Sequence, residues 1–140
     1  ILDVAKGFLN AVSIGRVDLS GSLGLPRTEI NSDFMFEQTM DIAKRSRERG
    51  YIVNFGGGIS FDAIPFICKM YPVNDRFETR KIVFRTNNDE KKLQRKIIHA
   101  MEFETLYLQN KCDFYDGMAN EDKARMQMMK DRMEIARQQM

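Results

Sequence analysis

Short apolar runs alternate with helical patterns in the first part of the chain, and this alternation limits the possible folds most strongly. Residues 11–14, 51–55 and 80–84 form apolar runs with the length of a buried strand. Residues 34–49 and 61–70 carry helical patterns of apolar residues. Strands separated by helices pair in parallel, and the helices cover the sheet. The sequence therefore predicts an α/β fold with three parallel strands.

Capping and turn residues mark the expected ends of these elements. Ser32 or Asp33 is suited to cap the first of the two helices, and Gly50 is suited to end it. Ser60 is a plausible cap for the second helix. Residues 15–31 contain glycines and Pro26, and we expect them to form a long loop.

The last third of the chain predicts a helical segment of different character. A helical pattern begins near Asp89, and strong helix formers dominate residues 120–140. This segment is rich in methionine, at positions Met126, Met128, Met129, Met133 and Met140. We divide the chain into residues 1–87, with the strand–helix units, and residues 88–140. The second part is expected to pack on the first or on a neighbouring subunit, and an adaptable partner-binding face is the alternative.

Composition excludes several classes of protein. The 22 basic and 20 acidic residues nearly cancel, so no nucleic-acid partner is expected. No run approaches the roughly 20 apolar residues that span a membrane, and the first residues lack the order of a signal peptide. We therefore expect a cytoplasmic protein without a membrane partner. Cys68, Cys112 and His99 lack the spacing of a metal site or a disulfide framework.

One acidic residue directly follows the first apolar run. The stretch from Ile14 to Ser20 reads Ile-Gly-Arg-Val-Asp-Leu-Ser, and it places Asp18 just beyond the expected strand. The carboxyl ends of parallel strands are where α/β enzymes place catalytic and metal-binding groups. Asp18 is therefore the first candidate for a functional residue.

This stretch, with Ser22-Leu23-Gly24 after it, resembles the (I/V)-G-x-x-D-L-(S/A)…(S/A)-x-G signature of the HpcH/HpaI aldolase and citrate lyase β-subunit family. The resemblance implies a (β/α)₈ TIM barrel, of which this chain would supply the C-terminal part: about three β/α units, followed by additional C-terminal helices. The chain starts at Ile1 without a methionine, so we expect a piece of a longer protein.

The resemblance also implies an activity and a site. Members of this family are metal-dependent aldolases and carbon–carbon lyases that act on a 2-oxo acid or an acyl thioester, so a homo-oligomeric enzyme is expected. Asp18 would be one of two carboxylates that hold Mg²⁺ or Mn²⁺, and its partner would be a glutamate on an upstream strand that this sequence lacks. Backbone amides near Val17 and Asp18 would bind the substrate carboxylate. The catalytic base is not identified.

Two positions depart from the family pattern. Arg16 stands where proline is frequent, and it either meets an anionic substrate or is an exposed or ion-paired arginine in a loop. Gly56 stands where an apolar residue usually touches the substrate, so Gly56-Gly57-Gly58 leaves room for a larger substrate or for phosphate at the helix after Ser60. The three glycines alternatively form an ordinary turn.

Two further functions stay open. The chain is either a phosphate-binding barrel enzyme that uses the glycine loop, or a non-catalytic assembly module with a methionine-rich partner-binding tail. Lys81, in the run from Glu78 to Lys81, is able to form a Schiff base, but a position on the entry side of the third strand favours a structural role.

Overall fold

The computed structural model describes residues 2–4 and 7–138, without the side chains of residues 135 and 136. The chain divides into two compact units, Ile1–Glu102 and Phe103–Met140. We call the first the sheet unit and the second the helix unit. The sheet unit thus extends beyond residue 87 and includes the first turns of the long C-terminal helix.

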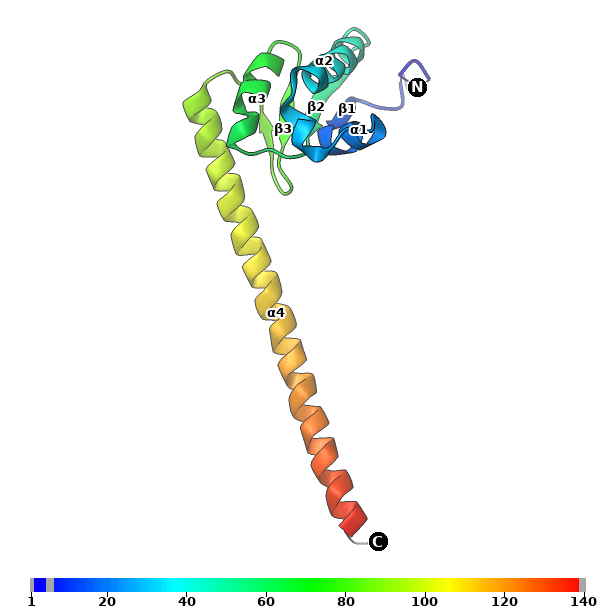
Figure 1. Ribbon diagram of the computed structural model, residues 1–140, viewed down its shortest axis with the longest axis vertical. Helices are drawn as coiled ribbons and strands as arrows, with labels where there is room; N and C mark the ends of the chain where they lie inside the picture. Colours follow the sequence, from blue (N-terminus) through cyan, green and yellow to red (C-terminus); the bar gives the residue numbers. More distant parts are fainter. Residues whose placement is uncertain (1, 5–6, 139–140) are drawn as a thin grey trace. The chain divides into compact units, whose positions relative to one another are not determined.

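The sheet unit contains a four-stranded, mostly parallel sheet (Figure 1). Strands β1 (Ala11–Gly15), β2 (Ile52–Gly56) and β3 (Arg76–Glu78) are parallel neighbours in this order, and β4 (Val83–Arg85) pairs antiparallel with β3. The predicted α/β class with a mostly parallel sheet is confirmed, and the first two predicted strands are parallel neighbours. The third was placed at residues 80–84 and this was wrong, because that segment overlaps the antiparallel β4, whereas the third parallel strand is β3. Residues 79–82 instead form the turn of a β3–β4 hairpin.

Helices and short 3₁₀ turns connect the strands. Their bounds are α1 (Arg16–Ser22), η1 (Arg27–Asn31), α2 (Asp33–Arg47), η2 (Phe61–Ala63) and α3 (Ile64–Met70). The expected loop over residues 15–31 is therefore mostly helical, because α1 begins directly at the end of β1. Only the segment between α1 and η1 is a turn, and Gly24 has a positive φ of 71° there.

Helix α2 begins and ends as its sequence predicts. The Ser32 Oγ accepts a hydrogen bond from the Met35 amide at 3.3 Å, which satisfies one of the free N–H groups of the first turn. Gly50 follows the helix with a φ of 83°, a conformation that glycine adopts without strain. Ser60, in contrast, stands before η2 but makes no capping hydrogen bond.

The two faces of the sheet differ in chemistry, because alternate residues of a strand point to opposite sides. One face carries Ile14, Val53, Phe55 and Phe77, which form the core with residues of α2, α3 and the start of α4. The other face carries Ser13, Asn54 and Glu78 with the strand-end glycines and several exposed residues of β1, β2 and β4. We call these the apolar face and the polar face.

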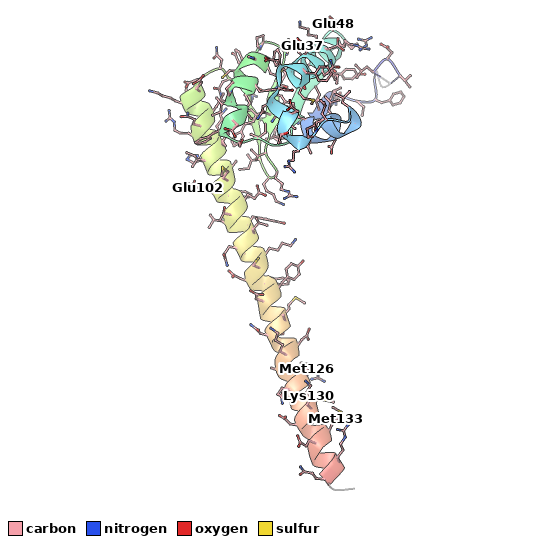
Figure 2. All side chains as sticks on the ribbon, in the orientation of Figure 1. Glu37, Glu48, Glu102, Met126, Lys130 and Met133 are labelled. Carbon is pink, nitrogen blue, oxygen red and sulfur yellow. The ribbon has the colours of Figure 1, made fainter. Side chains whose placement is uncertain are left out.

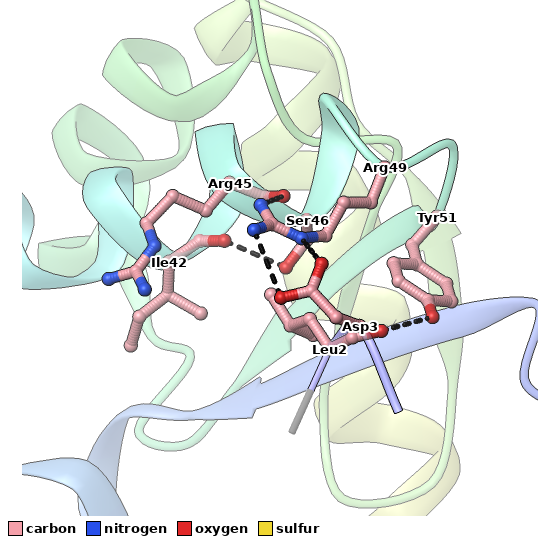
Figure 3. Close-up of polar contacts among 7 residues, drawn as sticks. All are labelled: Leu2, Asp3, Ile42, Arg45, Ser46, Arg49 and Tyr51. Atoms are coloured by element: carbon pink, nitrogen blue, oxygen red, sulfur yellow. Dashed lines mark hydrogen bonds and ion pairs between the residues drawn. The ribbon is translucent and has the colours of Figure 1, made fainter. Parts of the chain in front are cut away.

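The segment before β1 is tied to the end of α2 (Figure 3). Arg49 donates from Nε to Asp3 Oδ1 at 2.7 Å, and the Tyr51 hydroxyl donates to the Leu2 carbonyl at 2.8 Å. Tyr51 is buried, whereas the Asp3 side chain is mostly exposed. These contacts hold Leu2 and Asp3 close to the segment between α2 and β2.

Helix α4 (Glu90–Gln138) is one continuous helix of 49 residues. The sequence predicted helical structure in this part of the chain, but as more than one helix. Leu93, Ile97 and Ala100 are buried in the sheet unit. The side chains described between residues 105 and 138 are exposed. Met140 lies outside the described residues. Among the described residues, no helix has both the length and the apolar character needed to cross a membrane.

Candidate functional site at the carboxyl edge of the sheet

The carboxyl ends of three parallel strands lie side by side at one edge of the sheet. Gly15 of β1 pairs in register with Gly56 of β2, and Gly56 pairs with Glu78 of β3. Neighbouring strands are about 4.8 Å apart. Residues aligned in register point to the same face of a sheet, and for these three positions that is the polar face. This edge is where the sequence places its candidate site.

Asp18 lies over the end of β1. Its Oδ2 is 2.6 Å from the point that a Cβ on Gly15 would occupy, so a larger residue at position 15 would displace the carboxylate from this place. Asp18 is exposed and belongs to the first turn of α1, where a negative charge also interacts favourably with the helix dipole. The structure thus places Asp18 at the carboxyl edge, with its carboxylate reachable from solvent.

Glu78 lies over the end of β2 in the same way. A Cβ on Gly56 would stand 2.5 Å from Glu78 Cγ and 3.0 Å from Glu78 Oε1. The two strand-end glycines therefore each make room for a carboxylate on the polar face. Sequence reasoning missed Glu78 as a functional residue, because its place at the edge depends on the short strand β3.

An amide from β2 orients the Glu78 carboxylate. The Asn54 Nδ2 donates to Glu78 Oε2 at 2.6 Å and to Ser13 Oγ at 2.8 Å. Asn54 is 8% exposed, and its Oδ1 is buried without a hydrogen-bond partner in the described part of the chain. A buried amide oxygen without a partner is costly, so it favours a donor or a cation nearby.

Arg16 points into the protein and not toward the edge. Its side chain is fully buried, and it donates to Asn31 Oδ1 at 2.7 Å and to the carbonyls of Gly57 at 2.6 Å, Gly58 at 3.2 Å and Ile30 at 3.3 Å. Burial lowers the pKa of Arg16 to about 10, so the guanidinium remains charged at neutral pH.

The guanidinium carbon of Arg16 also lies 4.5 Å from the centre of the Phe66 ring, which adds a cation–π contact. Through its hydrogen bonds to both segments, Arg16 connects the glycine loop to η1. The expected exposed or ion-paired loop arginine is therefore not observed: Arg16 is buried, begins α1 and takes part in none of the ion pairs of the described residues.

The glycine loop is explained by its own packing. Gly57 and Gly58 have positive φ angles of 86° and 61°. A Cβ on Gly58 would collide with Ile30, and a Cβ on Gly57 would lie 2.9 Å from the Val17 amide nitrogen and 3.2 Å from that of Arg16. The turn and its close packing against the start of α1 thus require glycine here.

The other chemically reactive side chains are not part of the arrangement of Asp18, Glu78 and Asn54. Because β4 runs antiparallel to β3, Lys81 lies in the hairpin turn at the carboxyl edge and not on the entry side, which corrects the expected position. His99 is exposed on α4. Cys68 and Cys112 are free thiols, and burial, followed by the charges of Glu90 and Asp89, raises the pKa of Cys68.

The site offers oxygen donors, but they do not form a dense group of metal-ligand side chains. Within the described residues, no three His, Cys, Asp or Glu side chains are grouped to hold a metal ion. Asp18 and Glu78 supply two carboxylates over adjacent strands, and Asn54 supplies an unpartnered amide oxygen. Oxygen donors of this kind suit hard cations such as Mg²⁺ and Mn²⁺, so the donor set fits the expected metal.

A hollow elsewhere in the sheet unit does not coincide with this site. It has a volume of about 240 Å³ and is lined by Ile52, Asp75, Arg76 and Arg85. These residues lie at the opposite edge, where β2 and β3 begin. At the carboxyl edge, Asp18 is exposed and Glu78 is half-buried.

Comparison with known proteins gives no match. No family model fits the chain, and no curated protein or solved structure matches it. The resemblance to the HpcH/HpaI and citrate lyase β-subunit family therefore depends on the motif around Asp18 alone.

Proposed function

We propose that the chain is the C-terminal part of a (β/α)₈ barrel enzyme, a divalent-metal-dependent carbon–carbon lyase or aldolase acting on a 2-oxo acid or an acyl thioester. The observation that carries this proposal is the placement of Asp18 and Glu78 over two glycines at the carboxyl ends of adjacent parallel strands. In parallel α/β enzymes this edge carries the reacting groups.

The one-sided cover of the sheet supports the barrel. Helices pack on the apolar face, as they do on the outside of a barrel, and the polar face corresponds to the barrel interior. Ser13, Arg76 and Arg85 are exposed on this face or at its rim. A face with polar side chains at its carboxyl end is what a barrel requires around its active site.

Each residue of the site would have a separate role. Asp18 and Glu78 would hold the cation, and Asn54 would keep the Glu78 carboxylate oriented through its hydrogen bond. A divalent cation, when bound, would polarise the keto oxygen of the substrate and favour loss of a proton from the neighbouring carbon. The amides of Arg16 and Val17, beside Gly57, would donate to the substrate carboxylate. Gly56 and Gly57 would line the space for the substrate.

The phosphate alternative has less support. Arg16 already binds the carbonyls of the glycine loop, and the helix after Ser60 starts as a three-residue 3₁₀ turn without a side-chain cap. Tight packing and positive φ angles explain Gly57 and Gly58 without a ligand. The carboxylate pair is therefore the stronger basis for a function.

The proposal is tested by titrating the 140-residue chain with Mn²⁺ in a calorimeter. Replacing Asp18→Asn or Glu78→Gln should weaken Mn²⁺ binding by about tenfold or more, because each removes one charged ligand. Glu37→Gln on α2, the side chain labelled in Figure 2, is the matched control and should leave the affinity unchanged. Equal Mn²⁺ affinity of the wild type and Asp18→Asn would contradict the proposal.

A functional readout separates metal binding from chemistry. In D₂O with Mg²⁺, the longer protein that supplies the rest of the barrel should exchange the methyl protons of pyruvate for deuterium, which proton NMR detects, and its Asp18→Asn variant should not. Metal binding without exchange would limit the site to a cation site and would reject the lyase.

The second candidate function, an assembly module, is supported by a different observation. The described side chains of the helix unit are almost all exposed, including many apolar ones. Large exposed apolar surfaces mark interaction sites in proteins. This function and the lyase do not exclude each other, since they use different units.

A further inference from the structure

The helix unit carries a stripe of apolar side chains along one side of α4. Residues spaced by three and four positions share one side of a helix with 3.6 residues per turn. The stripe consists of Tyr107, Leu108, Tyr115, Met118, Met126, Met129 and Met133. Each of these side chains is more than 40% exposed, for example Tyr115 at 55% and Met126 at 52%. Figure 2 shows Met126 and Met133 projecting from the helix.

Charged residues interrupt this stripe in a regular order. Glu104, Lys111, Asp122 and Arg125 fall within it by the same spacing, so the signs alternate along the chain. No ion pair of the described residues involves Lys111 or Asp122. The Lys111 Nζ lies 5.7 Å from the centre of the Tyr115 ring. Lys111 and Asp122 thus present their charges within the stripe without an ion pair among the described residues.

We propose that α4 pairs with α4 of a second copy of this chain, antiparallel, about a twofold axis between Asp116 and Gly117. In this register Lys111 of each copy faces Asp122 of the other, and Tyr115 faces Met118. Further out, Glu104 faces Met129, with Arg125 one turn away. The aromatic half of each stripe packs on the methionine half of the other, and sulfur–aromatic contacts are favourable.

The alternating charges select this orientation. Antiparallel pairing brings two Lys111–Asp122 pairs together by symmetry, because a twofold contact repeats every interaction. Parallel pairing in register would place Lys111 against Lys111 and Asp122 against Asp122, and like charges at such positions are destabilising. The charge order therefore favours the antiparallel pair, independently of what the sheet unit binds.

Helix length adds a reason for a partner. An isolated helix gains little stability from its own backbone, and most helices in proteins depend on burial of an apolar side. Over residues 103–138, the described part of the helix unit, α4 is the one secondary-structure element, so no second element of this part buries the stripe. A second copy supplies a complementary surface of equal length.

Charge reversal tests the pairing. Light scattering of the 140-residue chain should show a dimer that dissociates on dilution. Lys111→Glu or Asp122→Lys should weaken dimerisation by about tenfold, since each reverses two symmetric contacts. The double variant Lys111→Glu/Asp122→Lys should regain the wild-type dissociation constant. A monomer at all concentrations, or a double variant weaker than both single ones, overturns the proposal.

Cross-linking tests the orientation. In a background with Cys68→Ser and Cys112→Ser, the variants Glu104→Cys and Met129→Cys are oxidised separately and as a mixture. Antiparallel pairing predicts disulfide-linked dimers in the mixture only, because residue 104 of one copy faces residue 129 of the other. Dimers within either single variant indicate parallel helices and reject the antiparallel pair. No cross-link in any sample also rejects it. Neither result bears on Mn²⁺ binding at Asp18.

Discussion

The two units of this chain obtain their structure from different sources. The sheet unit has a buried core in which Phe55, Phe77, Ile67 and Leu93 are completely shielded from solvent. The helix unit is regular over its whole length, yet the side chains of Phe114 and Met118 are 64% and 51% exposed. Contacts between distant residues thus fix the first unit, whereas the described side chains of the second form no such core within one chain. Substitutions should therefore act differently in the two.

The candidate functions follow the same division. The carboxylate site needs Asp18 and Glu78, which come from α1 and β3 and lie over neighbouring strands only when the sheet forms. The stripe of α4 comes from one continuous segment and is present whenever the helix is. Loss of the fold should abolish the first function and leave the surface needed for the second largely intact.

The largest expected difference between the units concerns buried and exposed phenylalanines. Phe77→Ala removes a fully buried ring that packs 5.3 Å from Phe84, and we expect it to lower the free energy of unfolding by about 3–5 kcal/mol. Phe114→Ala, at an exposed site, should change it by less than about 0.5 kcal/mol. Urea unfolding at low protein concentration measures both values. Similar losses would mean that the helix unit also has a core.

The next effect concerns the buried guanidinium of the sheet unit. Arg16→Lys keeps the charge but offers one ammonium group to four acceptors, so buried carbonyls lose their donors. We expect a loss of about 2–3 kcal/mol in unfolding free energy. The exposed Arg27→Lys serves as the control and should be neutral. If Arg16→Lys were equally neutral, the bonds to the glycine loop would not contribute to stability.

The alkylation rates of the two cysteines compare burial in the two units directly. Cys68 in α3 is partly buried, and burial with the nearby Glu90 and Asp89 raises its thiol pKa, so less reactive thiolate is present. Cys112 in the helix unit is exposed. Iodoacetamide should therefore label Cys112 about tenfold faster than Cys68 in the native chain, as mass spectrometry can follow. In urea the two rates should converge, and equal native rates would contradict the difference in burial.

The fold was predictable from the sequence where patterns are long or end signals are clear. Residues 11–14 and 51–55 form strands as predicted, and α2 has its cap at Ser32. Strand β3 was not predictable, because it has three residues and only Phe77 among them is buried. Helix α1 was missed because it holds Gly21 and two serines, which are weak helix formers.

The site was predictable only in part. Asp18 could be placed at the strand end because it closely follows β1 in the sequence. The partners of Arg16 could not be foreseen, since Asn31 and Gly57 are distant along the chain and become neighbours only through folding. Glu78 was missed because the third strand was assigned to residues 80–84, which placed Glu78 before a strand and not at the end of β3. Local patterns identify single residues, while their grouping depends on strand pairing.

The smallest effect compares two exposed glycines in helices. A Cβ at Gly117 of α4 or at Gly21 of α1 meets no atom within 4 Å, so alanine fits at both positions. Gly117→Ala should stabilise its part of α4 by about 0.8–1 kcal/mol, because glycine is a poor helix former. Hydrogen exchange should slow at the amides around residue 117, while the urea midpoint of the sheet unit stays the same. Gly21→Ala should instead raise that midpoint, because α1 unfolds with the sheet. If Gly117→Ala also raised it, the two units would unfold as one cooperative structure.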